Sequence, residues 1–88
     1  MDQASDRHLS ADAILSRVLD IFRAELEDDD LVVDLATRQS DLKAWDSLAH
    51  IRLVSAIESE FDIAFSLAEI EQITSVKQFV EVIKARAE

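Results

Sequence analysis

The 88-residue sequence contains no cysteine, no glycine and no proline. The absence of cysteine rules out both a disulfide framework and a thiolate metal site. Without glycine there is no phosphate-cradling loop of the P-loop or dinucleotide-binding kind, and tight hairpin turns lack their preferred residue. Because the two histidines show no ligand-like spacing, we predict no metal site. These absences exclude several large enzyme classes and argue against a β-sandwich or a β-barrel.

Basic residues are also scarce, since nine lysines and arginines face nineteen aspartates and glutamates, for a formal net charge of −10. This charge argues against nucleic acid and against an anionic membrane surface as partners. It favours partner proteins with basic docking patches, although acidity that only keeps the protein soluble would look the same. No apolar run reaches the length of a membrane span, and residues 1–10 hold no apolar signal core. We therefore expect a cytoplasmic protein.

Apolar residues three and four positions apart predict two long helices in the first two thirds of the chain. The first is expected over Ala11–Leu26, with Ser10 as its N-cap. The second is expected to begin near Ser47 and to end near Phe61. The apolar stripes of the two helices contain Ile14, Leu15, Val18, Leu19, Phe22 and Leu26 in the first, and Leu48, Ile51, Val54, Ile57 and Phe61 in the second.

Two capping boxes predict two further helices near the C-terminus. Ser66 with Glu69 begins a short helix, and Ser75 with Gln78 begins the last one. The residues expected to point inward are Leu67, Ile70, Ile73, Val76, Phe79, Val80 and Ile83. Because no single helix can bury its stripe alone, the four must pack together, and the fold class is all-α. We expect a tail at 1–9 that is not ordered and one domain at 10–86.

A long connection, Glu27–Trp45, separates the first two helices. Val32 and Val33 would suit a short strand, but no partner strand is present elsewhere in the sequence. A connection of this length is expected to be functional or pinned to the domain. We predict that its scattered leucines and valines hold it against the helices and that Trp45 anchors its end.

The candidate functional residues lie where this connection meets the second helix, at Asp46-Ser47-Leu48. Unpaired backbone N–H groups and the helix dipole favour a negative group at a helix N-terminus, so a phosphodiester on the Ser47 hydroxyl would be well placed. We expect Leu48 to point into the core and to anchor the turn, with the Asp46 carboxylate beside the hydroxyl. The alternative is that Ser47 only caps the helix, because serine is among the best N-caps.

Three spaced segments, Trp45–Ile51, Ile57–Ser66 and Ile73–Val76, resemble the acyl carrier protein family, and most closely its stand-alone members with a Trp-Asp-Ser-Leu motif. The resemblance covers about Ser10 to Lys84 and implies a small four-helix bundle with a long first loop. It implies that a phosphopantetheinyl transferase moves 4′-phosphopantetheine from coenzyme A onto Ser47. The thiol of that arm would hold acyl groups as thioesters, and the protein would carry them to acyl-loading and acyl-processing enzymes without catalysis of its own.

The resemblance also suggests secondary sites. Acidic residues available for docking are Asp46, Glu58, Glu60, Glu69 and Glu71, although each is equally understandable as a solvated charge. Residues that would line an acyl-chain shelter, or simply pack in the core, are Val54, Ile57, Phe61 and Ile70. We expect a monomer. The sequence departs from the family in Lys43-Ala44-Trp45 before the motif, in Asp62 after the second helix, and in His50 and Arg52 near its start.

Three other interpretations remain open at this point. A peptidyl or aminoacyl carrier would share the fold and the arm. A non-carrier interaction bundle would use Ser47 only as a cap. A hydrolase would need Ser47 and His50, three residues apart, to act together with an aspartate, but the sequence lacks a nucleophile elbow and an oxyanion hole.

Overall fold

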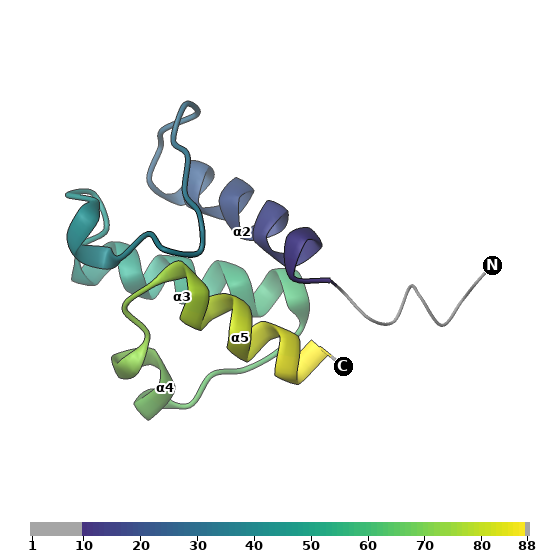
Figure 1. Ribbon diagram of the computed structural model, residues 1–88. Helices are drawn as coiled ribbons and strands as arrows, with labels where there is room; N and C mark the ends of the chain where they lie inside the picture. Colours follow the sequence, from purple (N-terminus) through teal and green to yellow (C-terminus); the bar gives the residue numbers. More distant parts are fainter. Residues whose placement is uncertain (1–9, 88) are drawn as a thin grey trace.

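The computed structural model describes residues 10–87, so the predicted tail at 1–9 lies outside the described residues. The described part contains four α-helices, α2 (Ala11–Glu25), α3 (Ser47–Phe61), α4 (Leu67–Gln72) and α5 (Val76–Ala87), and the short 3-10 helix η1 (Gln39–Asp41). The all-α fold class and the order of the helices are therefore confirmed. In the view of Figure 1, α3 crosses the molecule, with α2 drawn above it and α5 and α4 drawn below it.

The ends of the helices are set by local side chains. The Ser10 hydroxyl accepts a hydrogen bond from the Ala13 N–H at 3.1 Å and so begins α2. Ser66 and Glu69 form the predicted reciprocal capping box at the start of α4. α3 ends because Asp62 adopts the left-handed conformation, with φ of 55°, which aspartate tolerates better than most residues.

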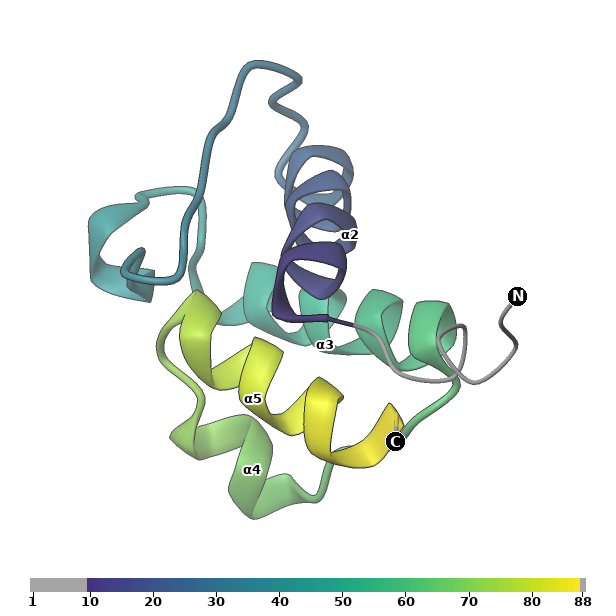
Figure 2. The same ribbon diagram turned by 45° about the vertical axis from the view of Figure 1, so that its right-hand side comes forward.

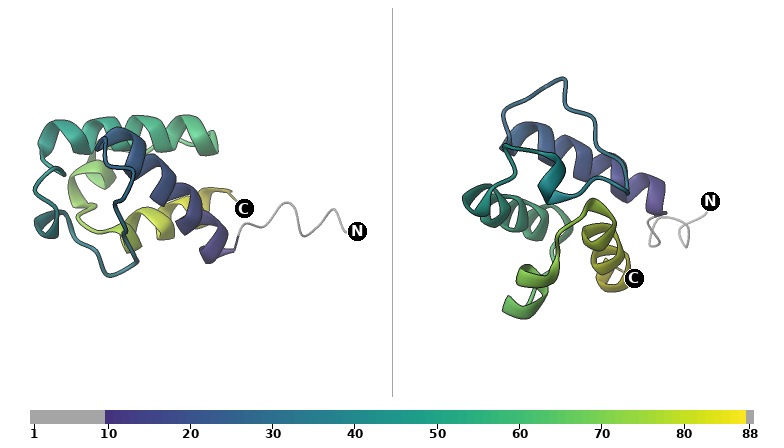
Figure 3. Two further views of the ribbon diagram at one scale, coloured as in Figure 1. Left: turned by 90° about the horizontal axis from the view of Figure 1, so that it is seen from above. Right: turned by 60° about the vertical axis from the view of Figure 1, so that its left-hand side comes forward.

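The core lies between α2, α3 and α5. α2 packs against both of the other helices, and Figures 2 and 3 show it crossing over α3 and α5 from two further directions. Ile14, Val18 and Phe22 of α2 are fully buried. The predicted stripe of the last helix is also confirmed, because its four members are buried, namely Val76, Phe79, Val80 and Ile83. α4 differs from the other helices because none of its residues is buried.

The long connection between α2 and α3 is pinned to the first turn of α5 by backbone hydrogen bonds. The N–H of Val76 donates to the Thr37 carbonyl at 2.9 Å, and the N–H of Lys77 donates to the Leu35 carbonyl at 3.2 Å. The Gln39 N–H donates to the Thr74 carbonyl at 2.8 Å. These bonds satisfy N–H groups that a helix start leaves without partners. The prediction of a pinned connection is correct, but apolar side chains supply only part of the attachment, because Val32 is 73% exposed.

Three orientations predicted for apolar side chains are wrong, and one of them is that of Ile51, which is 56% exposed. Leu48 is 74% exposed and does not enter the core, and Leu67 is 71% exposed. The buried face of α3 runs instead through Ala49, His50, Leu53, Val54 and Ile57. Because successive residues are rotated by about 100° around a helix, this placement leaves Leu48 and Ile51 on the flank. Leu67 is the first residue of α4 and lines a groove between α3 and α4, open to solvent, rather than the core.

Among residues 10–87, no helix is both long enough and apolar enough to cross a membrane.

Candidate functional site

Ser47 is the first residue of α3, and the residue before it provides the cap. The Asp46 carboxylate accepts a hydrogen bond from the Ala49 N–H at 2.9 Å. The Ser47 side chain is exposed, and its hydroxyl has no hydrogen-bond partner within the described part of the chain, residues 10–87. The interpretation of Ser47 as a mere cap is therefore wrong, because Asp46 fills that position. The hydroxyl is left free at the positive end of a fifteen-residue helix.

A groove of about 310 Å³ lies beside Ser47, between α3 and α4. α3 contributes one wall, and α4 contributes the other. The residues that line it are Gln39, Ser47, His50, Ile51, Leu67, Ile70, Glu71 and Ile73. The groove is partly apolar, since four of these eight side chains are leucine or isoleucine. It places a surface that accepts both polar and apolar groups directly next to the free hydroxyl.

An aromatic cluster supports the site from below. Trp45 is buried, and its ring is perpendicular to that of Phe22 with a centroid separation of 4.9 Å. It also stacks on Phe79 of α5 at 6.1 Å. Contacts of this kind add to the free energy of burial and fix ring orientation. The prediction that Trp45 anchors the end of the connection is confirmed, and the anchor fixes the backbone two residues before Ser47.

His50 is buried next to this cluster with both ring nitrogens engaged. Its Nδ1 accepts a hydrogen bond from the Trp45 indole N–H at 2.9 Å. The ring proton is therefore on Nε2, which donates to the Ile70 carbonyl at 2.8 Å. A general base needs a free nitrogen directed at the nucleophile. The structure thus contradicts the hydrolase interpretation, since His50 has no nitrogen left for the Ser47 hydroxyl.

Of the five acidic residues predicted to be available for docking, Asp46 caps α3, and the four glutamates have different surroundings. Glu58 is partly buried and accepts from the Phe65 N–H at 2.8 Å, so it holds the end of α3. Glu60 lies 3.6 Å from the Arg17 guanidinium. Glu71 is exposed and lines the Ser47 groove.

Glu69 is the most strongly held of the four. Its carboxylate accepts from the Ser66 N–H at 2.8 Å, and the same carboxylate pairs with Arg86 of α5. The backbone hydrogen bond from Ser66, followed by that from Arg86, lowers the pKa of Glu69 below its ordinary value. All the docking assignments stay predictions, and of the four glutamates Glu71 is the one that lines the same groove as Ser47.

The residues proposed to line an acyl shelter divide between core and groove. Val54 and Ile57 are buried core residues, and Phe61 is partly buried, with the Arg17 guanidinium 5.5 Å from its ring centroid. Of the four, Ile70 lines the groove beside Ser47. Sequence reasoning missed Gln39 as a lining residue, because it lies in the connection and has no periodic signal. It also did not assign Leu67 to the groove, because helical spacing suggested a core position.

The comparisons with known proteins agree with one another. The family model described as the phosphopantetheine attachment site matches residues 14–83. An acyl carrier protein from Clostridium acetobutylicum is 33% identical over 75 residues, which cover 85% of this chain and 97% of that protein. This chain belongs to the acyl carrier protein family. The solution NMR structure of the holo acyl carrier protein from Geobacter metallireducens matches with a TM-score of 0.77 at 30% identity, covering 83% of this chain and 84% of that one.

Membership of the acyl carrier protein family confirms the resemblance seen in the sequence and brings with it a covalent phosphopantetheine group. The site fits such a group on an observation independent of the comparisons. A phosphodiester needs an exposed hydroxyl without a competing partner and a surrounding that tolerates negative charge, and the start of α3 offers both. The acyl carrier protein family is one of carriers rather than of catalysts.

Proposed function

We propose that this protein is an acyl carrier whose Ser47 bears the 4′-phosphopantetheine arm and which presents acyl groups to biosynthetic enzymes. The observation that carries the assignment is the position of Ser47. Its hydroxyl is exposed, has no partner among residues 10–87 and lies at the N-terminus of α3. The family resemblance supports the same assignment, because Asp46, Ser47 and Leu48 correspond to the family's Asp-Ser-Leu motif.

Each neighbour of Ser47 has a separate task in this proposal. Asp46 fixes the first turn of α3 by accepting from Ala49, so the capping bond does not occupy the Ser47 hydroxyl. Trp45 holds the approach to the turn against the core. The dipole of α3 stabilises the negative charge of a phosphodiester at this end. When attached, the arm supplies a thiol, which this cysteine-free chain otherwise lacks. The exposed side chain of Leu48 leaves the surface next to Ser47 open to partner enzymes.

The partners in this proposal are a phosphopantetheinyl transferase and acyl-loading and acyl-processing enzymes with basic docking patches. The net charge of −10 supports electrostatic steering toward such patches. Because a tethered substrate has a high effective concentration at each enzyme, weak docking is sufficient for delivery. The domain bounds at 10–86, the monomeric state and the cytoplasmic location stay predictions.

The assignment of Ser47 is tested by intact-mass measurement. The purified protein is incubated with coenzyme A, Mg²⁺ and a promiscuous phosphopantetheinyl transferase, and we expect the mass of one phosphopantetheine group to be gained. The gain should disappear in Ser47→Ala and persist in Ser55→Ala, which removes another exposed hydroxyl from the same helix. A gain that persists in Ser47→Ala, or no gain with a transferase that modifies a control carrier, would overturn the assignment.

A further inference from the structure

His50 is the one buried polar residue among residues 10–87, and neither the attachment of the arm nor the docking of partners accounts for it. Burying an imidazole is costly unless both of its nitrogens are satisfied. Both are satisfied here, by the Trp45 indole on one side and by the Ile70 carbonyl on the other. The ring therefore connects the end of the long connection, the start of α3 and the middle of α4.

α4 depends on such connections more than the other helices do. It has six residues, none of them buried, so apolar packing holds it weakly. Two of its hydrogen-bonded contacts come from α5, namely Gln78 Nε2 to the Gln72 carbonyl at 3.1 Å and the pair between Arg86 and Glu69. Within the described chain, the hydrogen bond from His50 is the one that reaches α4 from α3. It joins the two walls of the groove that contains Ser47.

We propose that His50 is a positioning residue that holds α4 against the first turns of α3 and so sets the width of the groove beside Ser47. Trp45 has a part in this arrangement, because its N–H keeps the ring proton on Nε2, where it meets Ile70. An enzyme that acts on Ser47 then meets the hydroxyl and the face of α4 in a fixed relation. The consequence for enzymes that act on Ser47 rests on the proposed function of Ser47, whereas the effect of His50 on the position of α4 does not.

Two substitutions separate the two bonds of the ring. His50→Gln places an amide N–H near the position of Nε2 and retains a donor for Ile70. His50→Asn places an amide oxygen near the position of Nδ1 and retains only the acceptor for Trp45. If His50 serves general core stability, both variants lose stability throughout the molecule. If His50 positions α4, the Gln variant keeps α4 in place beside α3, and the Asn variant loosens α4 without a matching loss elsewhere.

The first measurement is amide hydrogen exchange in the unmodified protein. The amides of Ile70 and Ile73, which donate to Ser66 and Glu69 at 3.0 Å, report on α4. In His50→Asn we expect their exchange to become roughly fivefold faster relative to core amides of α2, because one hydrogen bond is lost. In His50→Gln we expect their exchange to stay near the wild-type rate. Equal acceleration in α2 and α4, or no acceleration in α4, would overturn the proposal.

The second measurement is the kinetics of the transferase on the same variants. We expect His50→Asn to raise KM for the carrier while kcat stays near the wild-type value, because the hydroxyl itself is unchanged and only its surroundings have moved. An unchanged KM in a variant whose α4 has loosened would contradict the link to the groove. If Ser47 is not the modified residue, the exchange experiment still decides whether His50 positions α4.

Discussion

At the start of α3, two adjacent residues divide two tasks. Asp46 accepts the capping hydrogen bond from Ala49, and Ser47 leaves its hydroxyl free. A serine that capped its own helix would use its oxygen to accept a hydrogen bond from a backbone N–H. That bond would make the oxygen less available to an enzyme that modifies it. The aspartate therefore keeps the serine available, and this is a physical reason for the order Asp-Ser rather than Ser alone.

This division predicts unequal effects of two alanine substitutions on the stability of the unmodified protein. We expect Asp46→Ala to lower the free energy of unfolding by about 1 kcal/mol, because the cap is lost. Ser47→Ala is expected to change it by less than about 0.5 kcal/mol, as usual for an exposed position. Urea unfolding checks both values. Asp46→Asn is the control and should stay close to the wild type, and a larger loss in Ser47→Ala than in Asp46→Ala would refute the division.

The elements themselves could be predicted well where their signals are local. Ser10, Ser66 and Ser75 mark helix starts because each side chain bonds to a backbone N–H three residues later. The groove could not be predicted in the same way. Its walls depend on how α3 and α4 are rotated about their axes relative to the rest of the molecule. That rotation leaves the side chains of Leu48 and Leu67 outside the core. Hydrophobicity alone gives no rotation angle for short stretches near a helix start.

The pair between α4 and α5 predicts a pH dependence. The pKa of Glu69 is lowered in the folded protein from its ordinary value of 4.5 by the Ser66 N–H and by Arg86. Because the folded pKa lies below the unfolded one, this contribution to stability is complete above the ordinary value and is lost as the pH falls through the folded pKa. Glu69→Gln keeps an acceptor for the capping box but has no charge to titrate.

We therefore expect the stability of Glu69→Gln to fall less steeply than that of the wild type between neutral pH and about pH 3. Urea midpoints measured across this range check the slope. Glu71→Gln removes the same charge from the same helix at an exposed position and serves as the matched control. The prediction would be contradicted if the urea midpoints of the wild type and of Glu69→Gln fell in parallel as the pH is lowered.

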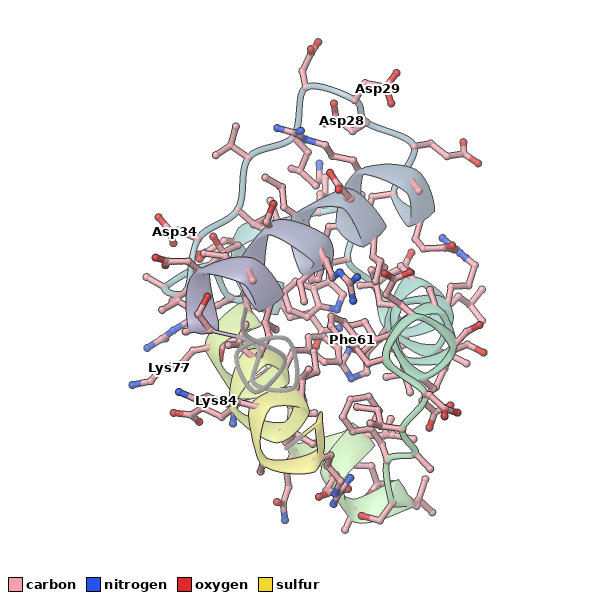
Figure 4. All side chains as sticks on the ribbon, turned by 90° about the vertical axis from the view of Figure 1, so that its right-hand side faces the viewer. Asp28, Asp29, Asp34, Phe61, Lys77 and Lys84 are labelled. Carbon is pink, nitrogen blue, oxygen red and sulfur yellow. The ribbon has the colours of Figure 1, made fainter. Side chains whose placement is uncertain are left out.

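At the scale of the whole molecule, negative charge dominates but is unevenly placed. Figure 4 shows Asp28 and Asp29 at the outer end of the connection after α2, while Lys77 and Lys84 lie on α5. α3 is poor in acids over its first turns, where it carries Arg52 and His50. Near Ser47, Glu71 lines the same groove and Asp46 caps α3 one residue earlier in the sequence. We therefore expect long-range attraction and local recognition to involve different carboxylates.

This arrangement predicts how the transferase reaction responds to salt. We expect KM for the carrier to rise as ionic strength increases from about 50 mM to about 500 mM, because screening weakens steering between exposed charges. Glu71→Gln should raise KM at low salt more than Asp29→Asn, which removes the same charge from the connection after α2 and not from the groove. A KM that stays flat with salt would rule out electrostatic docking, and equal effects of the two variants would rule out a local role for Glu71.

The burial of Trp45 has a practical consequence for anyone who handles this protein. It is the one tryptophan in the chain, it is 2% exposed, and it stands two positions before Ser47. Indole emission responds to water and to nearby protonated or polar rings, and the sequence contains no tyrosine to contribute a second signal. Intrinsic fluorescence therefore comes from a single place, next to the serine, and reports on that end of the molecule without any added dye.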